Sequence, residues 1–288
     1  MDTTMTIAMN EMAAPIAAAP AQKARMTGIR REINAVAAIL GRGILLALKS
    51  PASLIMSLVM PIVMMYMIGG NLQQNMAAGL GFDFGPYMLI GMLVNMLFMM
   101  TSQGLSSLVE DRETDFTQEM LIAPVSRHSI VIGTILGSSF LAIFSCLGTL
   151  TVGWLMGIRM SAGGLLAVFA LAPLMCLAAG AFGMLLLGAI KNRKAANMAI
   201  MLIPMAQMFL SGAIIPISNS SGALLVLSRL MPMTYCLDLV RAVVYAGTPE
   251  YGAVVMFNPA VTLAAIIGLT SVFLVVGTWL FARSEKNK

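Results

Sequence analysis

The sequence predicts an all-α integral membrane protein with six transmembrane helices. The first observation is composition: 59% of the 288 residues are hydrophobic and only 10% are charged, with a mean hydropathy of +0.91. Soluble domains carry about 25% charged residues, so a soluble enzyme is excluded. The second observation is that the apolar residues form six runs, each long enough for a spanning helix, which needs roughly 20 residues. The third is that Lys and Arg lie mainly between these runs.

Two segments precede the first apolar run. Residues 1–25 are rich in Ala, Met and Pro and carry mixed charge, so we expect a flexible cytosolic tail. In residues 26–50 apolar positions recur every three or four residues, which predicts an amphipathic helix lying in the membrane interface. The apolar positions are Ile29, Ile33, Val36, Leu40, Ile44 and Leu48. The alternative is that this helix extends the first span.

The six apolar runs contain no Asp, Glu, Lys, Arg or His. They cover residues 52–70, 86–109, 129–158, 163–190, 195–218 and 259–282. Prolines inside them are expected to kink or break helices, which transmembrane segments tolerate. These prolines include Pro61, Pro173, Pro204 and Pro216. We therefore predict one six-span domain over residues 51–283, followed by a short cytosolic tail at 284–288.

A segment of different character, residues 219–258, separates the fifth run from the sixth. Its apolar stretch from Ala223 to Leu230 is too short to span a membrane. A Pro-Met-Thr-Tyr turn follows at 232–235, and then a helix-like stretch extends to about Tyr245. This pattern predicts a re-entrant or interfacial helix pair before the last span.

The distribution of Lys and Arg predicts the orientation. If the N-terminus lies in the cytosol, fourteen of the 17 basic residues fall in cytosolic segments. The outer segments then hold only Arg159, Arg229 and Arg241. The positive-inside rule therefore places both termini in the cytosol. It also accounts for the net charge of +5 without any nucleic-acid partner.

The apolar runs also limit what could drive a transport reaction. Proton-coupled carriers need buried acids or histidines as relays, and these spans offer none, although a sodium site built from carbonyls and hydroxyls stays open. The single histidine, His128, lies at a membrane edge. No phosphate-binding GxxxxGK[ST] motif, HExxH motif or CxxC spacing occurs. We expect no enzymatic activity, no cofactor and no metal site in this chain, so ATP-driven transport would need a separate ATPase.

The loop between the second and third runs carries the most specific pattern. Residues 109–127 hold five of the chain's 12 acids and then the sequence Leu-Ile-Ala-Pro-Val-Ser-Arg, ending at Arg127. The acids are Glu110, Asp111, Glu113, Asp115 and Glu119. This order of an acidic segment, a short helix and an Ala-Pro-Val-Ser-Arg ending resembles the cytosolic signature of type-2 ABC exporter permeases.

Two further stretches resemble the same family. Phe209 to Pro216 is similar to the end of the family's fifth span, and Pro232 to Tyr235, followed by Asp238 and Arg241, is similar to its segment before the last span. Together the resemblance covers roughly residues 26–283. Within the family, the pattern is most similar to drug and antibiotic efflux permeases of the daunorubicin-resistance type. Permeases that export lipo-oligosaccharides or polysaccharides look similar.

The resemblance implies the permease subunit of an ATP-binding-cassette exporter in a prokaryotic cell membrane. It implies outward movement of a hydrophobic or amphipathic drug or lipid-like substrate, with ATP and Mg bound by two partner ATPase subunits. Two permease copies, identical or different, would assemble in contact with membrane lipid. The alternatives are a lipo-oligosaccharide or polysaccharide permease, and a membrane protein that binds an ATPase without transporting.

The resemblance also assigns candidate residues. The cytosolic loop would dock on the ATPase, unless its residues only cap a short helix. The candidates for this coupling are Glu110, Arg112, Glu113, Phe116, Pro124 and Arg127. In the outer re-entrant segment the candidates are Pro232, Tyr235, Asp238 and Arg241. Asp238 and Arg241 are three residues apart and share a helix face, so they either pair or take part in gating.

Polar residues in the second and fifth runs are candidates for a substrate path. They are Asn95, Thr101, Gln103, Gln207 and Ser211. Either they line a path, or they make ordinary hydrogen bonds between helices. The 28 methionines favour an adaptable apolar surface, because no Cys or His accompanies their clusters, whereas thioether binding of Cu(I) is the alternative.

Overall fold

The computed structural model describes residues 28–49, 82–106, 127–158, 160–190, 192–214, 216–217 and 222–286, together with positions 55, 59, 63, 66 and 67. Every regular element in these residues is a helix, which confirms the all-α class. The elements with assigned bounds are α2 (Gly28–Lys49), α5 (Phe84–Gly104), α8 (Arg127–Leu155), α9 (Ala162–Ala189), α10 (Arg193–Leu210), α11 (Ala223–Leu230), α12 (Pro232–Val244), α13 (Tyr251–Val254) and α14 (Pro259–Lys286).

Four helical segments are long and apolar enough to cross a membrane. They are α5, most of α8, α9 and the stretch Tyr251–Phe281 that contains α14. The pair α11 and α12, bent by 81°, makes a fifth candidate if it counts as one broken span. The apolar helix α10 is shorter, and the predicted first span at 52–70 lies mostly outside the described residues. A multi-pass membrane protein is thus supported, and the count of six spans stays a prediction.

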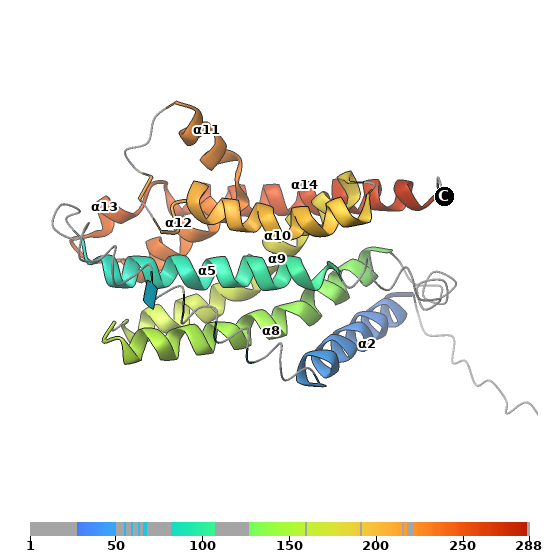
Figure 1. The fold of residues 1–288 in the computed structure, drawn as a ribbon, viewed down its shortest axis with the longest axis horizontal. Coiled ribbons are helices and arrows are strands. Elements are labelled where there is room, and N and C mark those ends of the chain that lie inside the picture. The colour runs from blue at the N-terminus through green and yellow to red at the C-terminus, as the bar shows by residue number, and fades with distance from the viewer. Residues whose placement is uncertain are drawn as a thin grey trace, which may run out of the picture.

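The helix α5 forms the centre of the bundle. Its apolar window is 83% buried, whereas the window of α14 is only 17% buried and lies at the periphery. The long helices run side by side in Figure 1, with α8 and α10 on either side of α5 in that view. Packed pairs include α5 with α8, α9 and α10, α9 with α14, and α2 with α8. The main hydrophobic core therefore surrounds α5.

Small residues bring neighbouring helix backbones close together. A Cβ built on Gly43 of α2 would lie 2.9 Å from the Cα of Gly137 in α8, so α2 has no room for a side chain at this position. In the α9–α14 pair, a Cβ on Gly277 would lie 2.7 Å from the backbone nitrogen of Leu185. Close approach through small residues is how helices associate where lipid removes the hydrophobic drive.

Polar caps fix where three of the helices begin. Asp83 accepts a hydrogen bond from the Gly85 amide at 3.0 Å, and Ser161 accepts one from the Gly164 amide at 3.0 Å. Asn192 does the same for the amide of Ala195 at 3.3 Å. Each cap satisfies a backbone N–H that has no partner within its helix. The helices therefore begin slightly before the apolar runs predicted at 86, 163 and 195.

The fifth predicted run, 195–218, is too long at its C-terminal end. The helix α10 stops at Leu210, and a turn occupies residues 211–214. Gly212 has a φ of 81°, a left-handed conformation that glycine adopts without penalty and that ends a helix. The predicted span continued across this turn because it was based on apolar character alone.

The two segments outside the predicted spans match the predicted elements in outline. The helix expected at 26–50 is α2, which packs on α8, while its place in the membrane interface stays a prediction. The helix pair expected at 219–258 is α11 and α12, and Pro232 is the first residue of α12, where its missing N–H costs nothing. Re-entry of this pair into the membrane stays a prediction.

Candidate functional site

The predicted ATPase-coupling loop lies largely outside the described residues. This applies to Glu110, Arg112, Glu113, Phe116 and Pro124. Arg127 is the first residue of α8, although its side chain is not described. The loop connects α5 to α8, and Figure 1 places the start of α8 at the same end of the bundle as the end of α14. Coupling through this loop stays a prediction.

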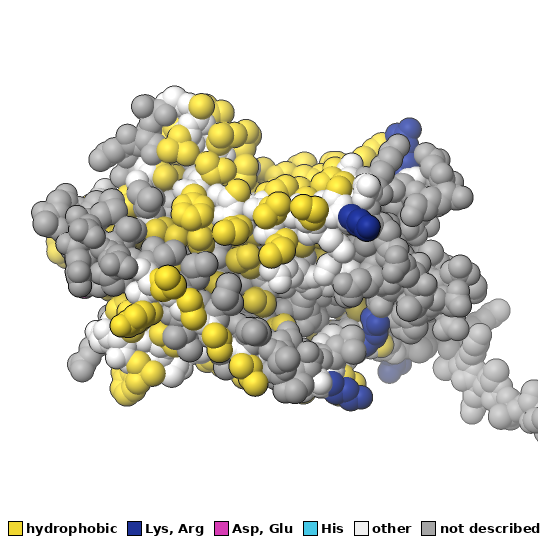
Figure 2. All heavy atoms as spheres, viewed as in Figure 1, with side chains coloured by type: hydrophobic (Ala, Val, Ile, Leu, Met, Phe, Trp, Pro, Cys, Tyr) yellow, Lys and Arg dark blue, Asp and Glu magenta, His cyan; other side chains and the backbone are white. Residues whose placement is uncertain are grey.

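Charge is distributed unevenly along the bundle. Figure 2 shows hydrophobic side chains over the middle of the visible face and over α11, with Lys and Arg gathered at the end where α14 finishes. The exposed basic residues Lys194 and Arg283 belong to the start of α10 and the end of α14. Basic residues at one end of an apolar band are the pattern of a cytosolic membrane edge.

Four of the five predicted path residues are buried inside the bundle. Asn95, Thr101 and Gln207 are fully buried, and Ser211 is 2% exposed, whereas Gln103 is half-buried. The side-chain nitrogen and oxygen of both Asn95 and Gln207 have no hydrogen-bond partner, and the same holds for the hydroxyls of Thr101 and Ser211. The amides of Asn95 and Gln207 therefore neither line an open surface of the single chain nor make hydrogen bonds between helices, and the role of the five residues in a substrate path stays a prediction.

The unpartnered groups lie at similar depth on two packed helices. Gly91 of α5 packs tightly against the carbonyl of Ala213, just after α10, and the two helices run in opposite directions (Figure 1). At about 1.5 Å rise per residue, Asn95 and Gln207 therefore lie within roughly two helical turns of this contact. We call Asn95, Gln207 and Ser211 the buried polar cluster, since Thr101 lies six residues further along α5. A buried amide without a partner costs roughly 1–3 kcal/mol, which marks the cluster as a place where water or a ligand polar group would be favourable.

A second constellation joins three elements at the opposite end of the bundle from the coupling loop. Arg241 of α12 donates from Nη2 to the carbonyl of Gly212 at 2.9 Å. The Tyr87 hydroxyl of α5 donates to the same carbonyl at 2.8 Å. The guanidinium carbon of Arg241 also lies 3.7 Å from the centre of the Tyr87 ring, a cation–π contact. The Tyr87–Gly212–Arg241 cluster thus ties the turn after α10 to α5 and α12.

Asp238, one helical turn before Arg241, binds a different element. Its carboxylate accepts hydrogen bonds from the amides of Met256 at 2.7 Å and Phe257 at 3.1 Å. It also accepts one from the Thr262 hydroxyl at 3.2 Å. Asp238 therefore anchors the start of α14, and the hydrogen bonds of the two predicted partners go to separate elements rather than to each other.

The remaining predicted residues of this segment hold the bend between α11 and α12. The Tyr235 hydroxyl donates to the carbonyl of Arg229 at 2.8 Å, and the Thr234 hydroxyl donates to the carbonyl of Ser228 at 2.7 Å. The Tyr235 ring also stacks with Phe257, with ring centres 5.7 Å apart. These contacts fold α11 back against α12 and fix its position relative to α14.

Sequence reasoning missed Tyr87, Gly212 and Thr262. Tyr87 lies 125 residues from Gly212, so no local pattern connects them. A tyrosine within the first turns of an apolar run was the available signal, because a buried Tyr hydroxyl needs a partner. Thr262 carried no signal, since hydroxyls in spans commonly bind their own helix backbone.

The comparisons with known proteins concern the whole chain and not a single residue. The chain matches no curated protein. The family model described as ABC-2 type transporter matches residues 34–245. The match runs from α2 to the residue after α12, so it includes the acidic loop, the buried polar cluster and Arg241. Because it covers more than half of the sequence, the chain belongs to the ABC-2 type transporter family.

Proposed function

We propose that this chain is the permease of an ATP-binding-cassette exporter that moves a hydrophobic or amphipathic compound out of the cell. The observation that carries the proposal is the ABC-2 family match over residues 34–245, which contains the acidic loop and its Ala-Pro-Val-Ser-Arg ending. In such an exporter the membrane path and the ATPase belong to separate subunits. The proposed compound is a drug, antibiotic or lipid-like molecule.

ATP hydrolysis is assigned to a partner. Two ATPase subunits, each with ATP and Mg, would bind the cytosolic end of the bundle through the loop between α5 and α8. The chain itself would have no enzymatic activity and no cofactor. Support comes from the basic residues gathered at that end, which fit a cytosolic membrane edge in the cell membrane.

A second permease copy, identical or homologous, would complete the path. The helix α10 supports this, because it presents an apolar face with i, i+3, i+4 and i+7 spacing that the single chain leaves uncovered. Its members, 44–61% exposed, are Met198, Met201, Leu202, Met205 and Phe209. Methionine side chains adapt to varied surfaces, which suits a path for hydrophobic compounds between two copies.

Gln207 and Ser211 lie on the opposite, buried side of α10, and Asn95 lies on the neighbouring helix α5. A path that opened between the helices would hydrate these amides and hydroxyls and remove their desolvation cost. Such an opening would couple the movement of α10 to the exposure of polar groups that guide an amphipathic molecule. This role is distinct from that of the Tyr87–Gly212–Arg241 cluster, which would hold the outer end of α10.

Transport by inside-out vesicles tests the proposal. Vesicles that contain the chain and its partner ABC ATPase should accumulate a fluorescent lipophilic drug when ATP is added, and should not do so with a non-hydrolysable ATP analogue. The double change Glu113→Ala plus Phe116→Ala should abolish accumulation, whereas Glu11→Ala in the N-terminal tail should not. ATP-dependent uptake of polysaccharide or lipo-oligosaccharide instead of drug would replace the proposed substrate, and ATPase binding without any uptake would contradict transport.

A further inference from the structure

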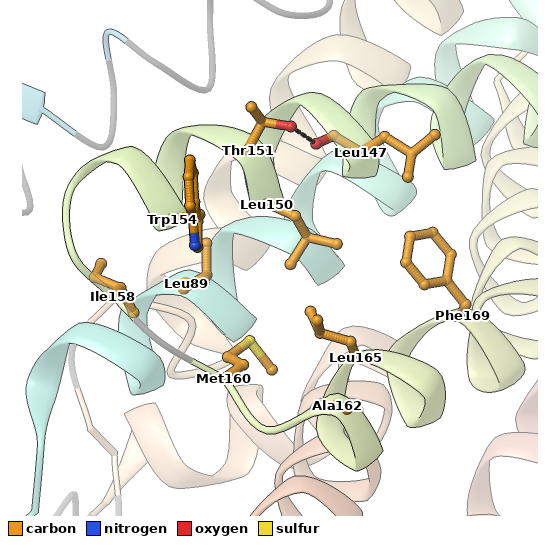
Figure 3. A pocket seen from close by; sticks show the side chains of 10 residues that line it. All are labelled: Leu89, Leu147, Leu150, Thr151, Trp154, Ile158, Met160, Ala162, Leu165 and Phe169. Atoms are coloured by element: carbon orange, nitrogen blue, oxygen red, sulfur yellow. Dashed lines mark hydrogen bonds between the residues drawn. The ribbon is translucent and has the colours of Figure 1, made fainter.

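An apolar cavity lies between α8 and α9, near the turn that joins them. Its volume is about 760 Å³, within the range of pockets that hold small molecules. Figure 3 shows α8 and α9 contributing most of the wall and Leu89 of α5 standing behind it. The lining residues are Leu89, Leu147, Leu150, Thr151, Trp154, Ile158, Met160, Ala162, Leu165 and Phe169.

The lining offers almost nothing to a polar ligand. None of the lining side chains is charged, and the Thr151 hydroxyl already donates to the carbonyl of Leu147 at 2.8 Å (Figure 3). The indole nitrogen of Trp154 is the other side-chain polar group in the lining. Apolar cavities without polar partners do not hold ordered water. The chemistry of the wall therefore fits a hydrocarbon.

The cavity opens to the outside of the bundle at membrane depth. Leu147 is 50% exposed and Trp154 is 68% exposed, so both form part of the open side. These residues are seven positions apart on α8, which at about 1.5 Å per residue makes the opening roughly 10 Å long along the helix. Both α8 and α9 are long and apolar enough to span a membrane, so the surroundings of the opening are lipid.

Trp154 indicates which part of the bilayer the cavity faces. The helix α8 ends one residue later at Leu155, and α9 begins at Ala162 after a short turn. Tryptophan at the end of a spanning helix is typical of the membrane–water interface. The cavity therefore extends from the interface into the hydrocarbon of one leaflet, which is the outer leaflet in the proposed orientation.

We propose that this cavity binds one acyl chain of a bilayer phospholipid, which enters from the lipid side between α8 and α9. The acyl chain would fill a gap that no side chain of the described residues occupies. Recognition is of the hydrocarbon and not of the headgroup, because none of the described residues that line the wall is charged. The site is separate from the buried polar cluster and from α10, so it requires that the helices lie in a bilayer but does not require transport.

A bound chain would stabilise the packing of α8 with α9 and α5. Anything that binds the folded state and not the unfolded state raises the free energy of unfolding, by an amount that grows with the logarithm of its concentration above Kd. Leu89 is packed between Gly153 of α8 and the cavity, since a Cβ on Gly153 would lie 2.8 Å from the Leu89 methyl groups. The bound lipid chain would therefore touch Leu89, the residue whose contact with Gly153 holds α8 against α5.

Photocrosslinking with a lipid tests this site. The purified full-length chain in detergent is mixed with phosphatidylethanolamine that carries a diazirine in the middle of one acyl chain, irradiated and mapped by mass spectrometry. We expect the label to concentrate between residues 147 and 169 and to saturate with lipid concentration. Unlabelled phosphatidylethanolamine and phosphatidylglycerol should compete equally, because the headgroup makes no specific contact.

A matched pair of variants separates the cavity from general lipid contact. Ala162→Phe should fill the cavity and remove most of the label, whereas Ala264→Phe, at an exposed position on α14, should leave the label at 147–169 unchanged. Label spread evenly over the exposed faces of α10 and α14, or protection of 147–169 by a second protein copy, would overturn the proposal. The saturation of the native chain decides the question even if Ala162→Phe does not fold.

Discussion

At the scale of single residues, the guanidinium of Arg241 has the most consequential position. It is only 4% exposed, yet it lies in a segment between two apolar runs, where burial of a charge is expensive unless it is paired. Its hydrogen bond to the Gly212 carbonyl and its stacking on Tyr87 supply that pairing without a carboxylate. The polar interactions of this one side chain therefore fix where the end of α10 lies.

Replacing Arg241 should weaken this attachment. Arg241→Ala removes a charge-assisted hydrogen bond and a cation–π contact, so we expect a loss of about 2–4 kcal/mol in the free energy of unfolding. Tyr87→Phe keeps the ring and loses one neutral hydrogen bond, so its cost should be about 1 kcal/mol. Thermal unfolding in detergent measures both, with exposed Arg229→Ala as the control. Equal effects of Arg241→Ala and Arg229→Ala would contradict the assigned role.

Asn95 allows the opposite prediction. Because both polar atoms of its buried side chain lack partners, Asn95→Leu removes a desolvation cost and retains the volume. We expect the unfolding free energy to change by less than about 1 kcal/mol or to rise. We also expect drug transport to fall, since a path that opens would lose a polar guide. A large loss of stability in thermal unfolding would show that Asn95 has a partner in the folded protein.

At the scale of elements, the apolar pattern predicted which segments are helices better than where they end. Helix starts are set by Asp83, Ser161 and Asn192, polar caps that a search for apolar runs leaves outside the span. The end of α10 is set by Gly212, whose positive φ is a local conformation without a hydropathy signal. Asp238 and Arg241 bind two different elements, through hydrogen bonds to residues that lie 18 and 29 positions away in the sequence.

For the candidate sites too, the sequence predicted some features and could not predict others. Four of the five predicted polar residues of spans two and five are buried, because helical register turns them toward the packed helices α5 and α10. The cavity between α8 and α9 was not predictable, since its volume depends on how far two helices separate beside a third. In the sequence, apolar residues such as Leu150 and Phe169 do not show whether they line a cavity or a tightly packed helix contact.

Packing of α2 on α8 makes a testable prediction at this scale. Gly43→Leu places a side chain against the backbone of Gly137, so we expect a loss of about 1–3 kcal/mol from overpacking. Gly41→Leu on the same helix meets no atom within 4 Å and should be neutral or slightly stabilising, because Leu is the better helix former. Thermal unfolding of the two variants provides the comparison. Equal stability of the two would exclude the close helix contact.

At the scale of the whole molecule, the bundle has two chemically different ends. One end gathers exposed Lys and Arg and contains the end of α5 and the start of α8. The other holds the Tyr87–Gly212–Arg241 cluster and the bent pair α11 and α12. The helix α10 runs between these two ends, so it is the element that the proposed coupling to an ATPase would use.

This arrangement predicts the labelling of introduced cysteines. The native Cys146, Cys176 and Cys236 are buried and should not react with a membrane-impermeant maleimide. Gly252→Cys, at an open position after α12, should react in intact cells, whereas Arg283→Cys should react only after the membrane is permeabilised. The reverse pattern would show that the termini face outward.

The central claim is that this ABC-2 chain works as the permease for a separate ATPase. The most direct measurement is copurification of the ABC ATPase with the chain from membranes, followed by ATP hydrolysis of the complex with and without the hydrophobic substrate. We predict a stable complex whose hydrolysis rises with substrate, and loss of that stimulation in the Glu113→Ala plus Phe116→Ala variant. Failure of any ATPase to copurify with the unmodified chain would contradict the account.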